Sequence, residues 1–558
     1  MLRFSSKSKW LLIFLALVFL GQFLAADEKT DKVDKIFAEW DTTVTPGATL
    51  AIIQDGQIIY KRGYGMAKLE DGIVMTPSKI FDIGSCSKQF TAACLAFLIR
   101  DGKVSPSDDI RKFFPEMPKY EKPITVDHLI HHTSGIRDYN GLLSLAGFRP
   151  DSDCPNIDEA LEVIFKQKRL NYPPGEEYSY TNSGYFLMGQ IVERVSGKSL
   201  NEFAQEHIFR PLGMKHTIFQ DDHLQIVKNR ATGYDPGEKG GYTLDMSNWD
   251  ETGDGNIYTS VEDLYLWDQA FYNFKLGKDL MDMLHTVGVL NNGKKIDYAF
   301  GLVIGEYKGL KTVSHGGAWA GFRAGIVRFP EQKFSVICLT NLATQNPSAL
   351  CYKVADIYLA DLLKEKPKEE KKKAETITLS KQELEEKAGN YQDDKFAAWI
   401  TFSVKDDKLQ MKLGREFALE PVSKTAFVTA DPQVVISLEF LADAKGKTNR
   451  VVLKRGKEDL YNAVKAAPVG PLTLAKLQEY AGDYVTEELL NARYRIVLEK
   501  DNLFVKFRTA SKDPLKAMAP DKFVLGRQSL EFLRSGGKKI TGFRLSVGRA
   551  GGIEFAKK

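Results

Sequence analysis

The C-terminal part of the chain repeats itself at an offset of about 93 residues, and this repeat constrains the fold more than any other feature. Three separated blocks recur in the same order. The matching pairs are Leu384–Tyr391 with Leu477–Tyr484, Asp407–Leu409 with Asp501–Leu503, and Ser437–Leu441 with Ser529–Leu533. Because the offset stays nearly constant across blocks that are far apart, we interpret this region as two copies of one small domain.

Each copy carries short runs of alternating polar and apolar residues, such as Arg493–Leu498 and Leu503–Phe507. Such alternation predicts strands with one buried face. Closing the strands into a barrel removes exposed sheet edges. We therefore predict two small antiparallel β-barrels, at residues 379–468 and 469–558. The stretch 364–378 before them is dominated by lysine and glutamate, which is typical of a charged, solvated linker.

Residues 27–363 mix helix and strand signals. Thr49–Ile53 is an apolar run rich in β-branched residues, and the Asp55-Gly56 pair after it is typical of a hairpin turn. A long apolar segment follows Ser85 and ends at Asp101-Gly102, which predicts a buried helix.

The 558 residues exceed what one core can hold and predict roughly three or four domains. A net charge of only +4 gives no electrostatic footprint for nucleic acid.

Residues 1–26 are organised like a secretory signal peptide. The order is a basic start, an apolar run and a small-residue cleavage site, carried by Arg3, Lys7 and Lys9, by Trp10–Leu20, and by Ala25-Ala26. The alternative is an uncleaved membrane anchor, but the run is short for a span, which needs about 20 residues. We expect a secreted or periplasmic protein with no integral membrane domain in the mature chain.

Ser85 and Lys88 form a Ser-x-x-Lys motif at the start of the predicted buried helix. The spacing is nearly one helical turn, so both side chains are expected on one face. Serine becomes a nucleophile when a neighbour takes its proton, and burial favours the neutral lysine amine that can do so. The same pattern recurs at Ser6–Lys9 and Ser535–Lys538, so the motif alone is weak. The alternative interpretation is a helix cap at Ser85 and a solvated Lys88.

Tyr180 and Asn182 lie about 95 residues further on, in the stretch Tyr178–Asn182. In extended chain, residues two apart face the same side. A tyrosine beside a lysine can relay a proton, and an asparagine amide can orient a substrate carbonyl or hold the lysine. The alternative is that these residues serve aromatic packing and helix capping.

His315, Gly316 and Gly317 form a third motif ahead of an expected strand. Two glycines allow a substrate backbone to approach closely. The N–H of Ala318, which follows them, is expected to pair with the N–H of Ser85 as an oxyanion hole, in which one donor is typically worth about 2.7–4 kcal/mol. A satisfied surface histidine is the alternative interpretation of His315.

Together, and in this order, the three motifs resemble the serine β-lactamase and penicillin-binding-protein superfamily, in the branch of class C β-lactamases, D-aminopeptidases and esterases. The stretches His128–Tyr139 and Gly253–Trp267 also resemble that branch. The resemblance covers about residues 40–360. It implies an α+β domain at residues 27–363, with an antiparallel sheet flanked by helices and a helical subdomain beside it. It also implies a site between the two, with Ser85, Lys88 and Tyr180 as catalytic residues. The predicted barrels are similar to the lipocalin-like pair that follows the catalytic domain in D-aminopeptidases.

We expect neither a metal nor a cofactor. His128, His131 and His132 fall within a stretch that is structural in the family, and no carboxylate stands at metal-ligand spacing beside them. The five cysteines are Cys86, Cys94, Cys154, Cys338 and Cys351. They show neither zinc-module spacing nor a disulfide framework.

The expected function is hydrolysis of small amides or esters through a Ser85 acyl-enzyme, with peptides containing D-residues as the favoured substrates. His315-Gly316-Gly317 stands where β-lactamases have Lys-Thr-Gly, and a mostly neutral histidine grips a drug carboxylate less well. A β-lactamase is therefore the alternative enzyme, and a non-catalytic penicillin- or peptidoglycan-binding protein is the alternative of another class. A barrel loop that narrows the cleft is a further hypothesis. The sequence leaves the oligomeric state open.

Overall fold

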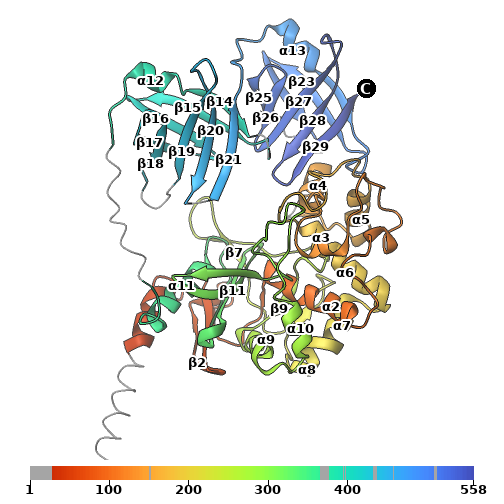
Figure 1. Ribbon diagram of the computed structural model, residues 1–558, viewed down its shortest axis with the longest axis vertical. Helices are drawn as coiled ribbons and strands as arrows, with labels where there is room; N and C mark the ends of the chain where they lie inside the picture. The colour runs from red at the N-terminus through yellow and green to blue at the C-terminus, as the bar shows by residue number, and fades with distance from the viewer. Residues whose placement is uncertain are drawn as a thin grey trace, which may run out of the picture.

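The computed structural model describes residues 28–558 except 150–151, 365–375, 394, 396, 432–435, 457 and 508–511. The predicted signal peptide and most of the predicted linker lie outside these residues. As predicted, an α+β domain is followed by two closed antiparallel barrels (Figure 1). None of the helices in the described part of the chain is long and apolar enough to cross a membrane.

The α+β domain is built on a six-stranded antiparallel sheet with the order β10-β11-β12-β13-β1-β2. Its strands are β1 (Ala48–Gln54), β2 (Gln57–Tyr64), β10 (Val303–Tyr307), β11 (Leu310–Trp319), β12 (Phe322–Phe329) and β13 (Phe334–Thr340). The early hairpin thus pairs with strands from the end of the domain, with Leu50 of β1 opposite Cys338 of β13. Strands β1 and β13 are buried almost throughout, because helices cover both faces of the sheet.

Helix α11 (Pro347–Tyr358) packs on β12 and β13, and α9 (Val261–Asn273) packs on β1 and β13. The core under α11 includes Val33 and Phe37 from the N-terminal helical segment. The core under α9 is continuous with that of the helical subdomain. The other short strands are β3 (Met66–Lys68), β4 (Ile73–Val74), β5 (Phe81–Asp82), β6 (Ile218–Phe219), β7 (Tyr234–Pro236), β8 (Tyr242–Leu244) and β9 (Ile257–Thr259).

The helical subdomain is built around α2 (Lys88–Arg100), which packs against α6 (Asn182–Ser196). Eleven of the thirteen residues of α2 are buried, in keeping with its continuous apolar sequence. The remaining helices are α3 (Val126–Ile130), α4 (Tyr139–Ala146), α5 (Ile157–Phe165), α7 (Leu200–Ala204), α8 (Arg210–Leu212) and α10 (Lys278–Met283). The turn that precedes α2 packs against β11 and β12, and Asn182 at the start of α6 contacts Lys88 at the start of α2.

The repeat folds into two eight-stranded barrels, each preceded by a short helix. Barrel 1 contains α12 (Lys381–Glu385) and the strands β14 (Gly389–Asp393), β15 (Trp399–Lys405), β16 (Lys408–Leu413), β17 (Arg415–Pro421), β18 (Ala426–Thr429), β19 (Ser437–Ala442), β20 (Thr448–Arg455) and β21 (Glu458–Lys465). Barrel 2 contains α13 (Leu474–Tyr480) and the strands β22 (Gly482–Val485), β23 (Arg493–Glu499), β24 (Asn502–Lys506), β25 (Lys512–Ala519), β26 (Lys522–Leu525), β27 (Gln528–Ser535), β28 (Lys539–Val547) and β29 (Ala550–Lys557).

The repeated sequence blocks occupy equivalent places in the two barrels. Tyr391 and Tyr484 lie on the first strand of each, and both hydroxyls donate to a carbonyl four residues earlier, at 3.0 Å to Lys387 and at 2.8 Å to Tyr480. Both tyrosines are fully buried. A buried phenol needs a partner of this kind, which explains why the tyrosine and the short helix before it recur together.

Candidate active site

Ser85 lies in a 3₁₀ turn, η1 (Gly84–Ser87), between β5 and α2. In a 3₁₀ turn, residues three apart eclipse one another, so Lys88 at the start of α2 sits directly beside Ser85. Gly84 has a φ of +47°, which a side chain disfavours. A Cβ at Gly84 would also lie 2.7 Å from the backbone nitrogen of Ala318. The glycine therefore lets β11 approach the turn that carries Ser85.

Lys88 is fully buried and its Nζ has three oxygen neighbours. They are Asp254 O at 2.6 Å, Asn182 Oδ1 at 2.9 Å and Ser85 Oγ at 3.1 Å. The first two oxygens can only accept, whereas a hydroxyl can also donate. A neutral amine has two hydrogens and one lone pair, so its hydrogens go to Asn182 and Asp254. Its lone pair is then left for the hydroxyl hydrogen of Ser85.

Burial favours the neutral form of the Lys88 amine. Burial lowers the pKa of Lys88 to about 8, against the opposing effects of the Asp254 and Asp138 carboxylates. Burial raises the pKa of Asp254 to about 6, while Lys88 opposes the rise. Tyr139 donates to Asp254 Oδ1 at 3.1 Å. A substantial fraction of Lys88 is therefore neutral near pH 8, where it can accept a proton.

Tyr180 lies on the other side of Lys88, with the ammonium nitrogen 5.0 Å from its ring centroid. Its hydroxyl is buried and makes no hydrogen bond to the described residues. Burial raises the pKa of Tyr180 far above its usual value, although the nearby Ser85 hydroxyl and Arg549 oppose the rise. The phenol thus keeps its proton at neutral pH, which suits a donor better than a base.

His315 lies on β11, with its ring centroid 6.3 Å from that of Tyr180. Its Nδ1 is 2.7 Å from Gly316 O, an acceptor, so Nδ1 carries the proton. Its Nε2 is 3.0 Å from the hydroxyl of Tyr298 and accepts from it. Burial lowers the pKa of His315 to about 4, so the imidazole is neutral at pH 7.

The two glycines after His315 have a packing role. A Cβ at Gly317 would lie 1.9 Å from Ile83 O, which excludes any other residue. Gly316 pairs with Gly325 of β12, and its added Cβ would lie 3.1 Å from Ser348 Oγ. Cys86 is fully buried and its thiol donates to His315 O at 3.2 Å. β11 is therefore held against the Ser85 turn along His315–Ala318.

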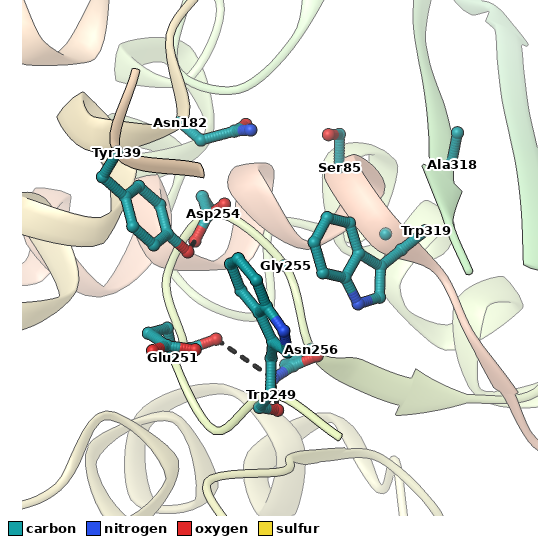
Figure 2. A pocket seen from close by; sticks show the side chains of 11 residues that line it. Ser85, Tyr139, Asn182, Trp249, Glu251, Asp254, Gly255, Asn256, Ala318 and Trp319 are labelled. Carbon is teal, nitrogen blue, oxygen red and sulfur yellow. Dashed lines mark hydrogen bonds between the residues drawn. The ribbon is translucent and has the colours of Figure 1, made fainter. Parts of the chain in front are cut away.

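Ser85, Asn182 and Ala318 line a common pocket (Figure 2). The other lining residues are Gly84, Tyr139, Trp249, Glu251, Asp254, Gly255, Asn256 and Trp319. Trp249 and Trp319 make an edge-to-face pair with centroids 5.3 Å apart, and Figure 2 shows them beside Ser85. The cavity measures about 40 Å³, which is room for a few water molecules.

Glu251 is the unusual member of this lining. Its side chain is only 3% exposed, and neither carboxylate oxygen has a hydrogen-bond partner among the described residues. Burial raises the pKa of Glu251 to about 8, and nearby Asp254 adds to the rise. The indole nitrogen of Trp249 is likewise buried without a partner in the described part of the chain. Buried polar groups without partners are costly, which is why such groups in a pocket point to a ligand.

Barrel 2 reaches this site through the turn between β28 and β29. Arg549 in that turn donates to Tyr180 O at 3.1 Å and pairs with Asp138 at 3.2 Å. Asp138 in turn accepts from the backbone N–H of Asn182 at 2.8 Å. Every residue that lines the pocket nevertheless belongs to the α+β domain. The turn therefore contacts the site at Tyr180 and Asp138 without lining this pocket.

The structure thus gathers Ser85, Lys88, Tyr180, Asn182, His315 and Ala318 around one place, while Gly316 and Gly317 position β11. The sequence analysis did not single out Asp254, Glu251, Trp249, Tyr298 or Arg549. Asp254 and Asp138 fall in the two stretches noted for their family resemblance, so a signal existed for them. The three histidines of the stretch His128–Tyr139 make separate contacts. His128 Nδ1 accepts from the backbone N–H of Thr125 at the start of α3, and His132 Nδ1 accepts from the backbone N–H of Thr181. His131 Nε2 bonds to Thr286 O.

A comparison with protein families agrees with this geometry. A family model described as Beta-lactamase matches residues 33–356. The chain belongs to this family. This match confirms the resemblance carried by the three motifs. The match ends close to α11, before the two barrels.

Relatives extend the likeness into the barrels. The chain is 26% identical over 533 residues to a D-aminopeptidase of Brucella melitensis, covering 92% of this chain and 96% of that one. It is 30% identical over 298 residues to a D-aminopeptidase of Gluconobacter oxydans, covering 53% of this chain and 56% of that enzyme. Among solved structures, the octameric penicillin-binding protein homologue from Pyrococcus abyssi matches with a TM-score of 0.56 and 26% identity, over 78% of this chain and all of that one.

Proposed function

We propose that this protein is an exported serine hydrolase that cleaves small amides or esters through an acyl-enzyme on Ser85. The observation that carries the proposal is the hydrogen bonding of Lys88 Nζ. Two acceptors, Asn182 Oδ1 and Asp254 O, take the amine hydrogens at 2.9 and 2.6 Å and leave its lone pair for the Ser85 hydroxyl. Export rests on the signal-like residues 1–26 alone.

In the first step, Lys88 accepts the hydroxyl proton while Ser85 Oγ attacks the substrate carbonyl. The negative charge on the carbonyl oxygen is stabilised by the backbone N–H groups of Ser85 and Ala318, which flank the pocket. The C–N or C–O bond then breaks. The leaving group takes a proton from the Tyr180 hydroxyl or the Lys88 ammonium, and an ester remains on Ser85.

In the second step, a water molecule attacks that ester and gives its proton to the neutral amine of Lys88. The bond between the acyl carbon and Ser85 Oγ then breaks, Ser85 Oγ takes the proton from the Lys88 ammonium, and the free acid leaves. When Tyr180 was the donor in the first step, the Lys88 ammonium returns a proton to the phenolate before the water attacks, because burial keeps the pKa of the phenol high. This transfer leaves the neutral Lys88 amine that the second step requires. Neutral His315 holds Tyr298 and β11 in place during both steps and carries no charge of its own.

The favoured substrates are short D-amino-acid amides or peptides with a free amine. Glu251 offers two carboxylate oxygens without partners among the described residues, and an ammonium group bound there would hold the carboxylate ionised. The relatives described as D-aminopeptidases support this substrate class. A β-lactam carboxylate is disfavoured, because neutral His315 offers it no positive charge.

The mechanism is tested by labelling the full chain with a fluorophosphonate or penicillin probe. We expect the adduct on Ser85, and we expect Ser85→Ala to lower amide or ester turnover roughly 10⁴- to 10⁶-fold. The matched control is Ser535→Ala, which removes the serine of an identical Ser-x-x-Lys pattern on barrel 2 and should leave turnover unchanged. An adduct on another residue, or full activity in Ser85→Ala, would refute the mechanism.

The substrate class is tested separately with Glu251→Gln. We expect kcat/KM for D-aminoacyl amides to fall roughly tenfold or more, since a charge-assisted hydrogen bond contributes about 1.5–3 kcal/mol. Turnover of p-nitrophenyl acetate, which has no amine, should change little. Equal losses on both substrates would contradict amine recognition, and fast nitrocefin hydrolysis by the unmodified protein would favour a β-lactamase instead.

A further inference from the structure

Three side chains of different chemistry meet beside the loop that carries Trp249 and Glu251, two residues that line the pocket. They are Cys154, just before α5; His223, in the segment after β6; and Asp250, between β8 and β9. Cys154 Sγ lies 3.7 Å from His223 Nδ1 and 3.6 Å from Asp250 Oδ2. His223 Nδ1 lies 3.0 Å from the same carboxylate oxygen, Asp250 Oδ2, and 2.9 Å from Oδ1. One donor atom from each residue therefore shares a single small volume.

This arrangement does not suit a cysteine nucleophile. In a catalytic triad the carboxylate holds one imidazole nitrogen and the thiol contacts the other. Here both Cys154 and Asp250 contact the same nitrogen, His223 Nδ1. The imidazole therefore cannot pass a proton between them across its ring. Convergence on one point is instead what a bound cation requires.

The separations agree with tetrahedral zinc. With zinc–sulfur, zinc–nitrogen and zinc–oxygen bonds of about 2.3, 2.1 and 2.0 Å, ligand atoms lie about 3.6 Å apart for S and N, about 3.5 Å for S and O, and about 3.3 Å for N and O. The observed values for Cys154 Sγ, His223 Nδ1 and Asp250 Oδ2 are 3.7, 3.6 and 3.0 Å. Only the nitrogen–oxygen pair must open, and Cys154 is exposed, so solvent can supply the fourth ligand.

We propose that Cys154, His223 and Asp250 form a binding site for a thiophilic divalent cation, with zinc as the expected metal. Thiolate, imidazole and carboxylate are the donor set that zinc prefers, whereas magnesium and calcium favour oxygen alone. The backbone N–H of His223 also donates to Asp250 Oδ1 at 2.6 Å, which orients the carboxylate before any metal arrives.

Binding is a simple exchange. The thiol proton of Cys154 passes to solvent, a sulfur–metal bond forms, and His223 coordinates through a neutral nitrogen. Burial and the carboxylate of Asp250 raise the pKa of Cys154 to about 11 in the metal-free protein. A cation at this point reverses the effect of that carboxylate on the thiol. Affinity is therefore expected to increase with pH.

The position of the site gives it a consequence for the pocket. Asp250 stands between Trp249 and Glu251, both of which line the cavity around Ser85 (Figure 2). Asn248 on the same loop donates to Asp153 O at 3.1 Å, next to Cys154. A metal bound to Asp250 ties this loop to the segments around Cys154 and His223. It thereby acts as a structural clamp on the pocket wall, at a distance from the reacting atoms.

The experiment uses the full chain after chelator treatment, titrated with Co²⁺ as a spectroscopic substitute for zinc. We expect equimolar binding with a near-ultraviolet thiolate-to-cobalt charge-transfer band and the intense visible bands of tetrahedral cobalt. Zinc should displace the cobalt and raise the thermal midpoint. It should also protect Cys154 from a thiol-alkylating reagent, because the other four cysteines are buried in the native protein.

Variants separate this site from adventitious binding. Cys154→Ser should abolish the charge-transfer band, and His223→Ala should weaken binding at least tenfold. The matched control, His216→Ala, removes an exposed histidine outside the cluster and should bind as the unmodified protein does. Cobalt binding without the charge-transfer band, equal binding by Cys154→Ser, or unprotected alkylation would each overturn the proposal. Probe labelling of Ser85 reports separately on the proposed hydrolase activity.

Discussion

The two barrels share one topology but differ in how they are attached to the catalytic domain. Each has eight antiparallel strands closed between its first and last strand. Figure 1 shows them side by side on one side of the catalytic domain, with barrel 2 next to α4 and α5. The buried residues of barrel 2 form one continuous cluster with the catalytic helices, whereas barrel 1 has a core of its own.

Barrel 2 is joined to the catalytic domain by buried polar contacts. Arg137 and Glu488 form an ion pair at 2.8 Å, with side chains only 2% and 4% exposed. Gln167 donates to Glu488 O at 2.7 Å, and Tyr494 donates to Leu145 O at 3.0 Å. Together with Arg549 behind Tyr180, these contacts make barrel 2 part of the scaffold of the site.

Barrel 1 is held mainly by contacts with barrel 2. Asn390 donates to Met518 O at 2.9 Å, and Trp399 donates to Ser529 Oγ at 3.1 Å. Toward the catalytic domain it offers Lys395, which pairs with Glu177 at 2.5 Å, both side chains being more than 40% exposed. Lys395 stands at the position that matches Glu488 in the repeat. The same position of the repeat thus carries a buried ion pair in barrel 2 and an exposed ion pair in barrel 1.

The largest expected effect follows from removing the buried anchor. Glu488→Ala leaves the guanidinium of Arg137 buried without its carboxylate, and breaking such a pair costs about 3–5 kcal/mol. We expect a much lower denaturation midpoint for the full chain. Turnover should fall as well, because the turn carrying Arg549 loses its support. Thermal and denaturant unfolding, followed with an activity assay, measure both effects.

The control for this prediction is the matching position in barrel 1. Lys395→Ala removes an exposed ion pair, which contributes between about 0 and 1 kcal/mol, and the turnover should stay the same. If both substitutions destabilised the protein equally, the two barrels would be attached alike. The contrast between a buried and an exposed contact would then be wrong.

The barrels themselves were predictable because a repeat at constant offset leaves its mark on the sequence. The same holds for Ser85 and Lys88, which are neighbours in the chain, and for Tyr180 and Asn182. The contacts that distinguish the barrels leave no such mark. Arg137 and Glu488 are 351 residues apart, and Arg549 and Tyr180 are 369 residues apart. In the sequence, nothing distinguishes these residues from the other charged and polar residues, because the two members of each pair meet only in the folded protein.

The cysteine, histidine and aspartate of the proposed metal site show the same limit. Cys154 and His223 are 69 residues apart, and His223 and Asp250 are 27 apart, so no motif with regular ligand spacing connects them. Glu251 was equally hidden, because an acidic residue in a polar stretch predicts solvent exposure. Its burial depends on how the loop between β8 and β9 closes over the pocket.

A smaller effect tests whether barrel 2 tunes the chemistry as well as the stability. The guanidinium of Arg549 lowers the pKa of Lys88, while Asp254 and Asp138 raise it. Arg549→Gln should therefore raise the pKa of Lys88 and move the ascending limb of the pH profile of kcat/KM to higher pH, by on the order of half a unit. The rate must rise with pH, because the neutral amine is the active form and the pKa of Lys88 is about 8.

The matched substitution within the catalytic domain should shift the same limb in the opposite direction. Asp254→Asn removes a negative charge beside Lys88 but keeps the backbone carbonyl that accepts from its amine. The pKa of Lys88 should fall further, so the limb should move to lower pH, and by more than Arg549→Gln moves it, since Asp254 has the larger influence. Full pH profiles of both variants measure this. Shifts in the same direction, or an unmoved limb in both, would mean that a group other than Lys88 titrates. Opposite shifts would instead mean that one charged residue from barrel 2 and one from the catalytic domain both act on the pKa of Lys88. Barrel 2 would then contribute to the chemistry of the active site, and barrel 1 would not.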